Sequence, residues 1–317
     1  MTTGVYLSYV GLGANLLHLS YCHQIAKQHG PIIVITLCKN LEETLADDPL
    51  IKKVYCLDKY HKKFLDIFKL SNFLKEFNFT NLLIYYPSLR IYLAAKIAGV
   101  KRVESYKFFK KKDLHLVNAA RSLTKKFLEI ENCVTETTFF IKKEKIENKK
   151  KELNNSNFKI VLGVGSSGPT TRWGSQNFVN LINQLNENGD YFFLILCGPN
   201  EREIEKNIIE NINKKNFMTL SDKKIKDLIP YLCLSNMYVG NDSFGSHITS
   251  QSGIKSIVFL LDSPKAYTDY SKNYYRILPK GYNINEITHG TNANPNLIEV
   301  KDVIKKIKEL KKLNDIF

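Results

Sequence analysis

The sequence predicts an α/β protein built from two doubly wound, Rossmann-like domains. At 317 residues the chain exceeds the size at which one hydrophobic core usually stops growing. Short apolar segments alternate with amphipathic helical segments along almost the whole chain, which is typical of parallel sheets. A Lys- and Asn-rich stretch at 142–157, which we expect to form a helix and a linker, interrupts this alternation. We therefore expect one domain at residues 1–145, a linker at 146–157 and a second domain at 158–317.

The spacing of apolar residues along the chain predicts the strands and helices of the first half. The predicted strands are Val5–Val10, Ile32–Leu37, Val54–Leu57, Leu82–Tyr86 and Arg102–Tyr106. The predicted helices are Asn15–Gln28, Lys62–Phe77, Leu89–Ala98 and Leu114–Ile130.

The second half repeats this architecture. Its predicted strands are Lys159–Val164, Tyr191–Cys197, Asn216–Leu220, Met237–Gly240 and Ser256–Leu261. Its predicted helices are Gln176–Asn188, Glu201–Ile212, Lys223–Leu234, Gly245–Ser252 and Val300–Leu313. Two such domains can face each other across a cleft, with the carboxyl ends of their strands on opposite walls. We expect the chemistry in the loops that follow those strands.

The composition describes a globular protein, with 44% hydrophobic and 24% charged residues. The six cysteines form no CxxC pair, which favours reduced thiols and argues against a metal site. No apolar stretch approaches the roughly 20 residues of a membrane-spanning helix, and no secretory leader is recognisable. These features predict a cytoplasmic protein.

The net charge of +15 is locally concentrated in the first half. Aromatic residues Tyr106, Phe108 and Phe109 interleave with a basic cluster made of Lys101, Arg102, Lys107, Lys110, Lys111 and Lys112. One interpretation is a plain lysine-rich surface. The other is attraction to an anionic membrane or to a phosphorylated acceptor. No nucleic-acid-binding module accompanies the charge, so nucleic acid is not an expected partner.

The first strand is followed by the loop Gly11, Gly13, Ala14 and Asn15, with Leu12 between the glycines. Its glycines permit a tight turn, and the helix that follows can offer N–H groups to an anion. The loop lacks the third glycine and the acidic residue of a dinucleotide fingerprint, so nicotinamide chemistry is not expected. A plain turn between strand and helix is the alternative.

The first loop of the second half runs from Gly163 to Gly174 and is rich in small and hydroxyl residues. We predict a diphosphate cradle made of Ser166, Ser167, Gly168, Thr171 and Arg172, with Arg172 as a charge clamp. The GxxxxGK[ST] pattern of a P-loop is absent. Trp173, the only tryptophan, is interpreted mainly as a packing residue.

A third loop carries Asp242, Ser243, Phe244, Gly245 and His247 at the start of a helix. Its N–H groups and hydroxyls can hold a diphosphate from the other side and stabilise it as a leaving group. The alternative is a simple N-cap by Asp242 or Ser243, with His247 partly buried. The presence of two such loops in one domain favours diphosphate binding over the N-cap interpretation.

In their order and spacing the three loops resemble glycosyltransferase family 9, the heptosyltransferase-like enzymes of GT-B fold. The resemblance rests on Gly13-Ala14-Asn15-Leu16-Leu17, on Thr171-Arg172-Trp173 and on Asp242-Ser243-Phe244-Gly245-Ser246-His247. Tyr86-Pro87-Ser88-Leu89-Arg90 falls where the family has a loop in its acceptor half.

The resemblance implies an inverting, metal-independent transfer of a heptose-like or other sugar from a nucleotide-diphosphate sugar. The implied acceptor is a lipopolysaccharide or another cell-envelope glycan, phosphorylated or lipid-linked, in a bacterium. No cofactor and no metal are implied, and peripheral contact with the inner membrane is compatible with the basic cluster. Which sugar, base and acceptor are used, and the oligomeric state, do not follow from the sequence.

Three departures from the family pattern affect the chemistry. Ala14 stands where the family has its presumed general base, an aspartate. Thr171 replaces a lysine, and Phe244 replaces a glycine. His18, one helical turn after Ala14, is the candidate substitute base, and an ordinary structural histidine is the alternative. A degenerate member that only binds sugar nucleotides or glycans, and a sugar-nucleotide epimerase of the same architecture, are the alternative functions.

Overall fold

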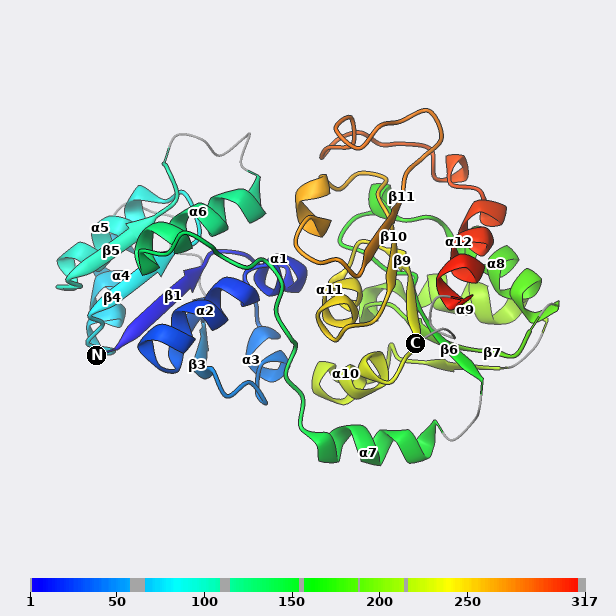
Figure 1. Cartoon of the computed structure of the whole chain (residues 1–317), viewed down its shortest axis with the longest axis horizontal. Coiled ribbons are helices and arrows are strands. Elements are labelled where there is room, and N and C mark those ends of the chain that lie inside the picture. Colours follow the sequence, from blue (N-terminus) through cyan, green and yellow to red (C-terminus); the bar gives the residue numbers. More distant parts are fainter. Residues whose placement is uncertain are drawn as a thin grey trace. The chain divides into compact units, whose positions relative to one another are not determined.

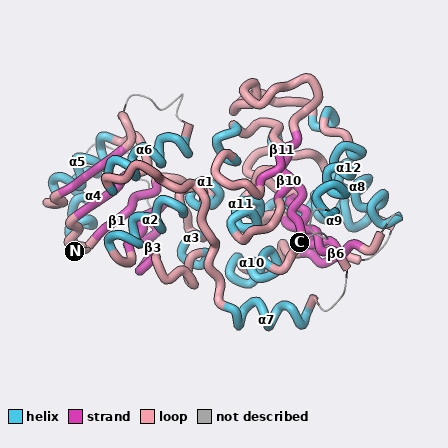
Figure 2. The backbone as a smooth tube through the Cα atoms, in the orientation of Figure 1, coloured by secondary structure: helices cyan, strands magenta, loops and turns pink. Residues whose placement is uncertain are grey.

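The computed structural model of the chain describes residues 2–57, 66–108, 115–153, 157–187, 189–213 and 216–312. The chain divides into two compact units, Met1–Phe140 and Ile141–Phe317. Each unit is a parallel sheet with helices on both faces (Figures 1 and 2). Within the described ranges, no helix combines the length and the apolar character that crossing a bilayer requires.

The first unit has a five-stranded sheet of order β3-β2-β1-β4-β5, in which every neighbouring pair is parallel. The strands are β1 (Thr3–Leu7), β2 (Ile32–Thr36), β3 (Ile51–Cys56), β4 (Asn81–Ile84) and β5 (Arg102–Ser105). The chain builds outward from β1 in one direction and then from β4 in the other. The order therefore reverses between β1 and β4, which is where a doubly wound sheet usually binds its ligand.

Helices cover both faces of this sheet because its buried strands are apolar on both sides. The helices are α1 (Leu12–Leu16), α2 (Leu19–His29), α3 (Leu41–Thr44), α4 (Asp66–Lys75), α5 (Leu89–Ile97) and α6 (Leu116–Leu128). Helices α4 and α5 pack on one face, where Ile35, Leu82 and Ile84 belong to the same core as Leu70 and Ala94. Helices α2 and α6 lie on the other face, as Figure 1 shows.

The second unit has a six-stranded parallel sheet of order β11-β10-β9-β6-β7-β8. Its strands are β6 (Phe158–Gly163), β7 (Tyr191–Leu196), β8 (Phe217–Thr219), β9 (Met237–Asn241), β10 (Ser256–Phe259) and β11 (Tyr274–Ile277). Here the order reverses between β6 and β9, which pair directly. This reversal is the expected ligand position in the second unit.

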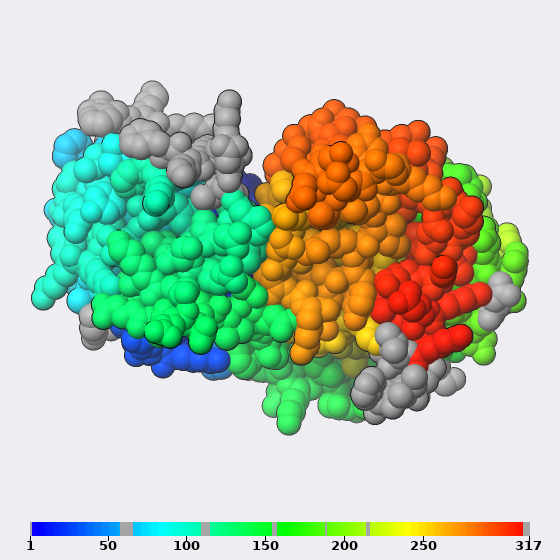
Figure 3. Space-filling view, turned by 45° about the horizontal axis from the view of Figure 1, so that its top comes forward, coloured from blue at the N-terminus to red at the C-terminus, as the bar shows by residue number. Residues whose placement is uncertain are grey.

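The helices of the second unit are α7 (Lys143–Glu152), α8 (Ser175–Glu187), α9 (Arg202–Asn211), α10 (Ile225–Cys233), α11 (Phe244–Gln251) and α12 (Val300–Lys312). Four short 3-10 segments complete the described part of the unit: η1 (Pro169–Thr171), η2 (Pro199–Glu201), η3 (Lys265–Thr268) and η4 (Pro295–Leu297). Helices α8, α9 and α12 contribute Ile182, Ile208 and Ile307 to one core against Leu162 and Phe193. In the space-filling view the segment that follows β10 (orange) and α12 (red) form a continuous stretch of this unit's surface (Figure 3).

The predicted α/β class is confirmed, and every predicted strand has a counterpart within a few residues of its predicted position. The structure adds β11 and the short α3. The predicted helix Asn15–Gln28 is wrong in one respect, because the chain forms α1 from Leu12 and then restarts as α2 at Leu19. Residues 62–65 of another predicted helix lie outside the described residues.

The stretch 142–157, predicted to form a helix and a linker, contains helix α7, which belongs to the second unit. Helix α7 packs against α10, and the Tyr231 hydroxyl of α10 donates a hydrogen bond to the Glu152 carboxylate. This contact explains why the division of the chain falls at Phe140. The exact domain bounds, and the cleft between the domains, stay predictions.

Candidate active site

Both loops predicted to hold a diphosphate leave the carboxyl ends of β6 and β9, the two strands at which the second sheet reverses its order. The loop after β6 runs through Ser166 and Arg172 to α8. The loop after β9 runs through Asp242 into α11. Sequence order alone does not make these strands neighbours, because β7 and β8 lie between them in the chain. The topology therefore brings the two predicted loops to one edge of the sheet.

Hydrogen bonds within the loop after β6 hold its backbone in a compact turn. The Ser166 hydroxyl lies 2.6 Å from the Thr171 hydroxyl and 2.9 Å from the carbonyl oxygen of Gly168. The Thr171 hydroxyl also donates to the Gly168 carbonyl, at 2.8 Å. Both hydroxyls are therefore engaged inside the loop, with the Gly168 carbonyl as their common acceptor.

Glu201 is the residue of this site that the sequence analysis did not identify. Its carboxylate accepts hydrogen bonds from the backbone N–H groups of Ser166 and Gly198, each at 2.8 Å. It also pairs with the Arg172 guanidinium at 2.7 Å, and only 11% of the side chain is exposed. A side chain at Gly165 would lie 1.9 Å from the Glu201 carboxylate, so glycine is required there. The position of Glu201 after the next strand, β7, was the available signal.

Only some of the N–H groups of Arg172, the predicted charge clamp, have hydrogen-bond partners. Its Nη2 atom donates to the Glu201 carboxylate and to the carbonyl oxygen of Ser166. Its Nε atom is buried and has no hydrogen-bond partner in the structure. A buried guanidinium N–H without a partner is costly, and an anionic ligand oxygen would satisfy it.

Trp173 and Asn241 join the two loops in the interior. Trp173 is fully buried, and its indole N–H donates to the Ile298 carbonyl at 2.9 Å. The Asn241 amide accepts from the Trp173 backbone N–H at 2.9 Å and donates to the Val164 carbonyl at 2.8 Å. The packing interpretation of Trp173 is therefore confirmed. Asn241 is fully buried and fixes the loops, so it is not exposed to a ligand.

Asp242 and His247 form a buried polar pair at the end of β9. The Nε2 atom of His247 lies 3.6 Å from Oδ1 of Asp242, and both side chains are less than one-tenth exposed. Oδ1 of Asp242 has no hydrogen-bond partner in the structure. Burial raises the pKa of Asp242 to about 6, although a hydrogen bond from Ser263 opposes this. Burial lowers the pKa of His247 to about 3, so the imidazole is neutral.

The other face of His247 is fixed by two tyrosines. Its Nδ1 atom lies 2.5 Å from the Tyr270 hydroxyl and 3.2 Å from that of Tyr274. Because tyrosine hydroxyls stay protonated, the neutral ring accepts at Nδ1 and carries its proton on Nε2, toward Asp242. Tyr270 is thus buried behind His247. Tyr267 lies half-buried beside His289.

Helix α11 begins beside this pair without a side-chain cap. Ser243 holds the N-cap position, but its hydroxyl lies 3.0 Å from that of Tyr238 and accepts no bond from the first turn. The N-cap interpretation is therefore wrong for the Ser243 side chain. A side chain at Gly245 would lie 2.4 Å from the Leu196 side chain, so Leu196 would have to shift to admit one. Phe244 is half-buried at the first position of the helix.

In the first unit, Asn15 braces the loop after β1. Its amide donates to the carbonyl oxygens of Tyr9 and Gly11, at 3.0 and 2.7 Å, and accepts from the Thr36 hydroxyl at 2.7 Å. Gly11 and Gly13 do not adopt positive φ angles, so the loop does not use the backbone conformations that favour glycine. Gly13 and Ala14 lie within α1, one helical turn long.

His18 does not offer a free ring nitrogen. Its Nδ1 atom lies 2.7 Å from the Ala14 carbonyl oxygen, to which it must donate, and its Nε2 atom accepts from the Tyr106 hydroxyl at 2.9 Å. The side chain is fully buried, and burial lowers its pKa to about 4. The ring is therefore engaged through both nitrogens, one of them bonded to the carbonyl of Ala14 in α1. The geometry favours the structural interpretation of His18.

A cavity that the sequence analysis did not identify opens at the end of β5. It has a volume of about 550 Å³ and is lined by polar, charged and apolar side chains: Glu104, Ser105, Tyr106, Lys107, His115, Asn118, Ala119, Ser122, Leu123 and Lys126. Lys107 and Tyr106 belong to the predicted basic cluster, whereas Phe109 to Lys112 lie outside the described residues. Lys126 pairs with Glu104 at 2.8 Å.

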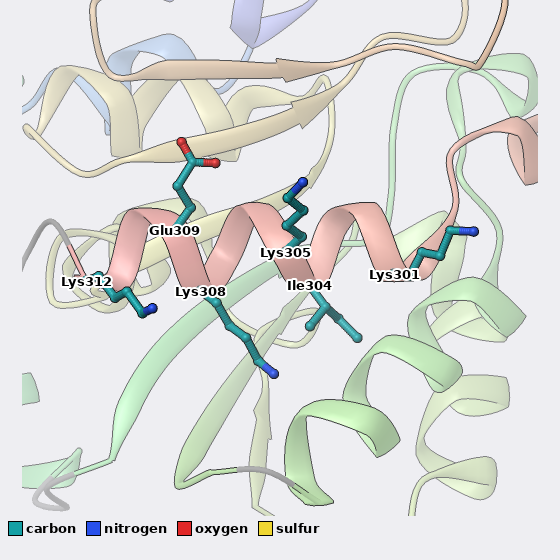
Figure 4. A pocket seen from close by; sticks show the side chains of 6 residues that line it. All are labelled: Lys301, Ile304, Lys305, Lys308, Glu309 and Lys312. Atoms are coloured by element: carbon teal, nitrogen blue, oxygen red, sulfur yellow. The ribbon is translucent and has the colours of Figure 1, made fainter.

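The hollow shown in Figure 4 is lined only by residues of α12, so it includes none of the loops after β6 and β9. Its lining is basic: Lys301, Ile304, Lys305, Lys308, Glu309 and Lys312. In the described part of the chain, no group of three or more His, Cys, Asp or Glu side chains is placed to hold a metal ion.

A family model described as glycosyltransferase family 9 (heptosyltransferase) matches residues 92–291. The structure of E. coli ADP-heptose LPS heptosyltransferase II is similar, with a TM-score of 0.73 at 14% identity over 98% of this chain and 100% of that one. A family 9 glycosyltransferase from Veillonella parvula gives 0.78 at 17% identity, covering 98% and 96%. E. coli heptosyltransferase WaaC with ADP gives 0.73 at 14% identity, covering 98% and 99%. These likenesses show a GT-B fold. Curated protein sequences give no match.

Proposed function

This chain belongs to glycosyltransferase family 9 and is a glycosyltransferase, and we propose that its second unit binds the nucleotide-diphosphate sugar. The observation that carries this proposal is the pair of buried atoms without partners on the two loops at the sheet reversal. Arg172 Nε is a donor that needs an acceptor, and Asp242 Oδ1 is an acceptor that needs a donor. A glycosyl diphosphate offers both, as phosphate oxygens and as sugar hydroxyls.

The departing diphosphate is stabilised in this proposal by the protein alone. Arg172 supplies positive charge, and the uncapped first turn of α11 supplies N–H groups and the positive end of the helix dipole. No cofactor and no metal take part in the proposed mechanism. An acceptor hydroxyl attacks the anomeric carbon from the face opposite the diphosphate, so the configuration is inverted.

The acceptor is proposed to bind in the first unit. The cavity at the end of β5 presents Lys107 and the ion pair of Lys126 with Glu104, together with the polar side chains of Asn118 and Ser122. This lining suits a phosphorylated glycan, because lysine binds phosphate as a point charge. We propose a lipopolysaccharide or another cell-envelope glycan as acceptor, reached by peripheral contact with an anionic membrane.

Ala14 favours a second candidate function, that of a family member that binds sugar nucleotides without transferring the sugar. Its methyl group cannot accept a proton, and His18 has both ring nitrogens occupied. The proposed transferase therefore takes its base from another group or from the acceptor itself.

The test incubates the intact protein with a panel of nucleotide sugars and a phosphorylated, lipid-linked glycan. ADP-heptose comes first, because two of the similar E. coli structures are named with ADP-heptose or ADP. Transfer predicts a glycosylated acceptor and one free nucleoside diphosphate per turnover. Binding without product favours the second candidate function, and the absence of both binding and product contradicts both.

A further inference from the structure

Helix α5 carries an exposed apolar stripe. Leu89, Leu93 and Ile97 are 51%, 36% and 46% exposed. Their spacing of four residues places them on one helix face, along about 12 Å at 1.5 Å per residue. The opposite face of α5 is already buried, through Ile91, Ala94 and Ala95. A short helix that is apolar on both faces usually contacts something on each of them.

Helix α4, which packs against α5, adds an exposed aromatic ring and further positive charge. Phe68 is 57% exposed. Lys69, which pairs with Asp66 at 4.0 Å, and Lys96 are exposed on the two helices, and Lys101 immediately precedes β5. Residues 66–108 hold seven basic against three acidic side chains: Lys69, Lys75, Arg90, Lys96, Lys101, Arg102 and Lys107 against Asp66, Glu76 and Glu104. The segment that contains both helices (cyan) reaches the surface of the first unit in Figure 3.

We propose that the exposed stripe of α5, with Phe68 and the lysines around it, is the surface by which this protein docks on an anionic lipid bilayer. Aliphatic and aromatic side chains beside lysines match the boundary between acyl chains and anionic headgroups. Each inserted side chain contributes separately, so a small apolar area suffices when lysines add attraction to the lipid charge.

A second copy of the chain fits this surface less well. A stable protein interface buries about 800 Å² on each partner, and three partly exposed aliphatic side chains provide only a fraction of that area. Positive charge around the stripe also opposes pairing with an identical surface. The inference rests on the proposed function only in that a lipid-linked acceptor gives the docking a purpose.

The experiment measures binding of the intact protein to vesicles by sedimentation. Vesicles of phosphatidylglycerol and phosphatidylcholine are compared with vesicles of phosphatidylcholine alone, at low and high salt. The wild type is expected to bind the anionic vesicles and to be released by salt. Leu93→Ser/Ile97→Ser should weaken this binding by about tenfold, since two apolar side chains are lost from the contact. Val134→Ser/Tyr282→Ser, which changes exposed apolar residues outside the stripe, should bind as the wild type does.

Charge variants separate this surface from general electrostatic attraction. Lys69→Glu/Lys96→Glu should abolish the salt-sensitive binding, whereas Lys305→Glu/Lys308→Glu on α12 makes the same change of net charge and should leave most of it. The reverse result, with binding lost only in the α12 variant, overturns the proposal. So does equal vesicle binding by Leu93→Ser/Ile97→Ser and the wild type.

Two further measurements complete the design. Sedimentation equilibrium of the wild type and of Leu93→Ser/Ile97→Ser tests whether a second copy binds this surface. A dimer that the wild type forms and this variant does not would overturn the bilayer assignment. Nucleotide binding in solution is expected to be the same in both proteins, because the donor site lies in the second unit. A wild type that binds nucleotide but not vesicles would refute this inference and leave the proposed function standing. A wild type that binds vesicles but no nucleotide would refute the proposed function and leave this inference standing.

Discussion

The Nε2 atom of His247 lies 3.6 Å from Oδ1 of Asp242, close enough for attraction but beyond a normal hydrogen bond. The Nδ1 side of the ring contacts the hydroxyls of Tyr270 and Tyr274. The Asp242 carboxylate is therefore buried and incompletely satisfied. Such a group lowers stability, and function is a common reason for retaining it.

Asp242→Asn should stabilise the protein above pH 6. The pKa of Asp242 is raised to about 6 from an ordinary value near 3.8, so the folded state holds this proton more tightly than the unfolded state. Stability contributed by this group is present below the lower value and is lost as pH rises through about 6. We expect the variant to gain about 1 to 3 kcal/mol in free energy of unfolding at pH 8 and almost nothing at pH 4.

Urea unfolding of wild type and Asp242→Asn at both pH values measures this difference. Asp222→Asn, at a side chain that is 73% exposed, is the matched control and should change stability little at either pH. The same Asp242→Asn variant should lose sugar-nucleotide binding. A variant that is less stable than the wild type at pH 8 would show that the ionised carboxylate is well accommodated.

Arg172→Gln should weaken nucleotide binding by about tenfold to a hundredfold, the usual effect of losing a charge-assisted hydrogen bond. Arg202→Gln is the control, because Arg202 also pairs with a carboxylate in the second unit but is 61% exposed. Isothermal titration with nucleoside diphosphates measures both. Equal affinities of the two variants would mean that Arg172 serves only to position Glu201.

Asn241→Ala should destabilise the second unit by about 2 to 4 kcal/mol. The substitution leaves the Trp173 N–H and the Val164 carbonyl buried without partners, and each such group costs about 1 to 3 kcal/mol. Thermal unfolding reports the loss. Asn180→Ala, on the outer face of α8, provides the comparison and should unfold almost as the wild type does.

His18→Ala should lower the free energy of unfolding by about 2 to 4 kcal/mol, because it leaves a cavity and removes two buried hydrogen bonds. The pKa of His18 is lowered to about 4, so its contribution is present above pH 6.5 and is lost as pH falls toward 4. The variant should therefore lose less stability on acidification than the wild type. His289→Ala, at an exposed histidine, serves as control. A stable His18→Ala variant without transferase activity would instead restore His18 as the candidate base.

Ala14→Asp tests how much activity the absent carboxylate costs. Ala14 is half-buried within α1, so a longer polar side chain can be accommodated. If the present chain transfers slowly, the variant should raise the rate by about a hundredfold, the lower end of general-base catalysis. Ala14→Asn, of the same size without the base, should not. Equal rates for all three proteins would show that the base lies elsewhere.

The sequence predicts the fold and the site to different depths. Strand positions follow from apolar segments such as Tyr191 to Leu196, because burial on both faces leaves a continuous apolar run. The loops after β6 and β9 are recognisable by their glycines and hydroxyls. Glu201 is not recognisable from the sequence as a site residue, because its role depends on β7 lying beside β6. His18 was assigned by helical spacing, and spacing does not reveal that the ring bonds back to Ala14.

Titration of ADP, GDP, UDP and CDP into the wild type, Arg172→Gln and the control Arg202→Gln tests the central claim most directly. We predict that the wild type binds at least one of these diphosphates at a single site, that Arg172→Gln binds it at least about tenfold more weakly, and that Arg202→Gln binds it with unchanged affinity. Binding of none of the four by the wild type, or equal binding by all three proteins, would contradict a diphosphate site at the reversal between β6 and β9.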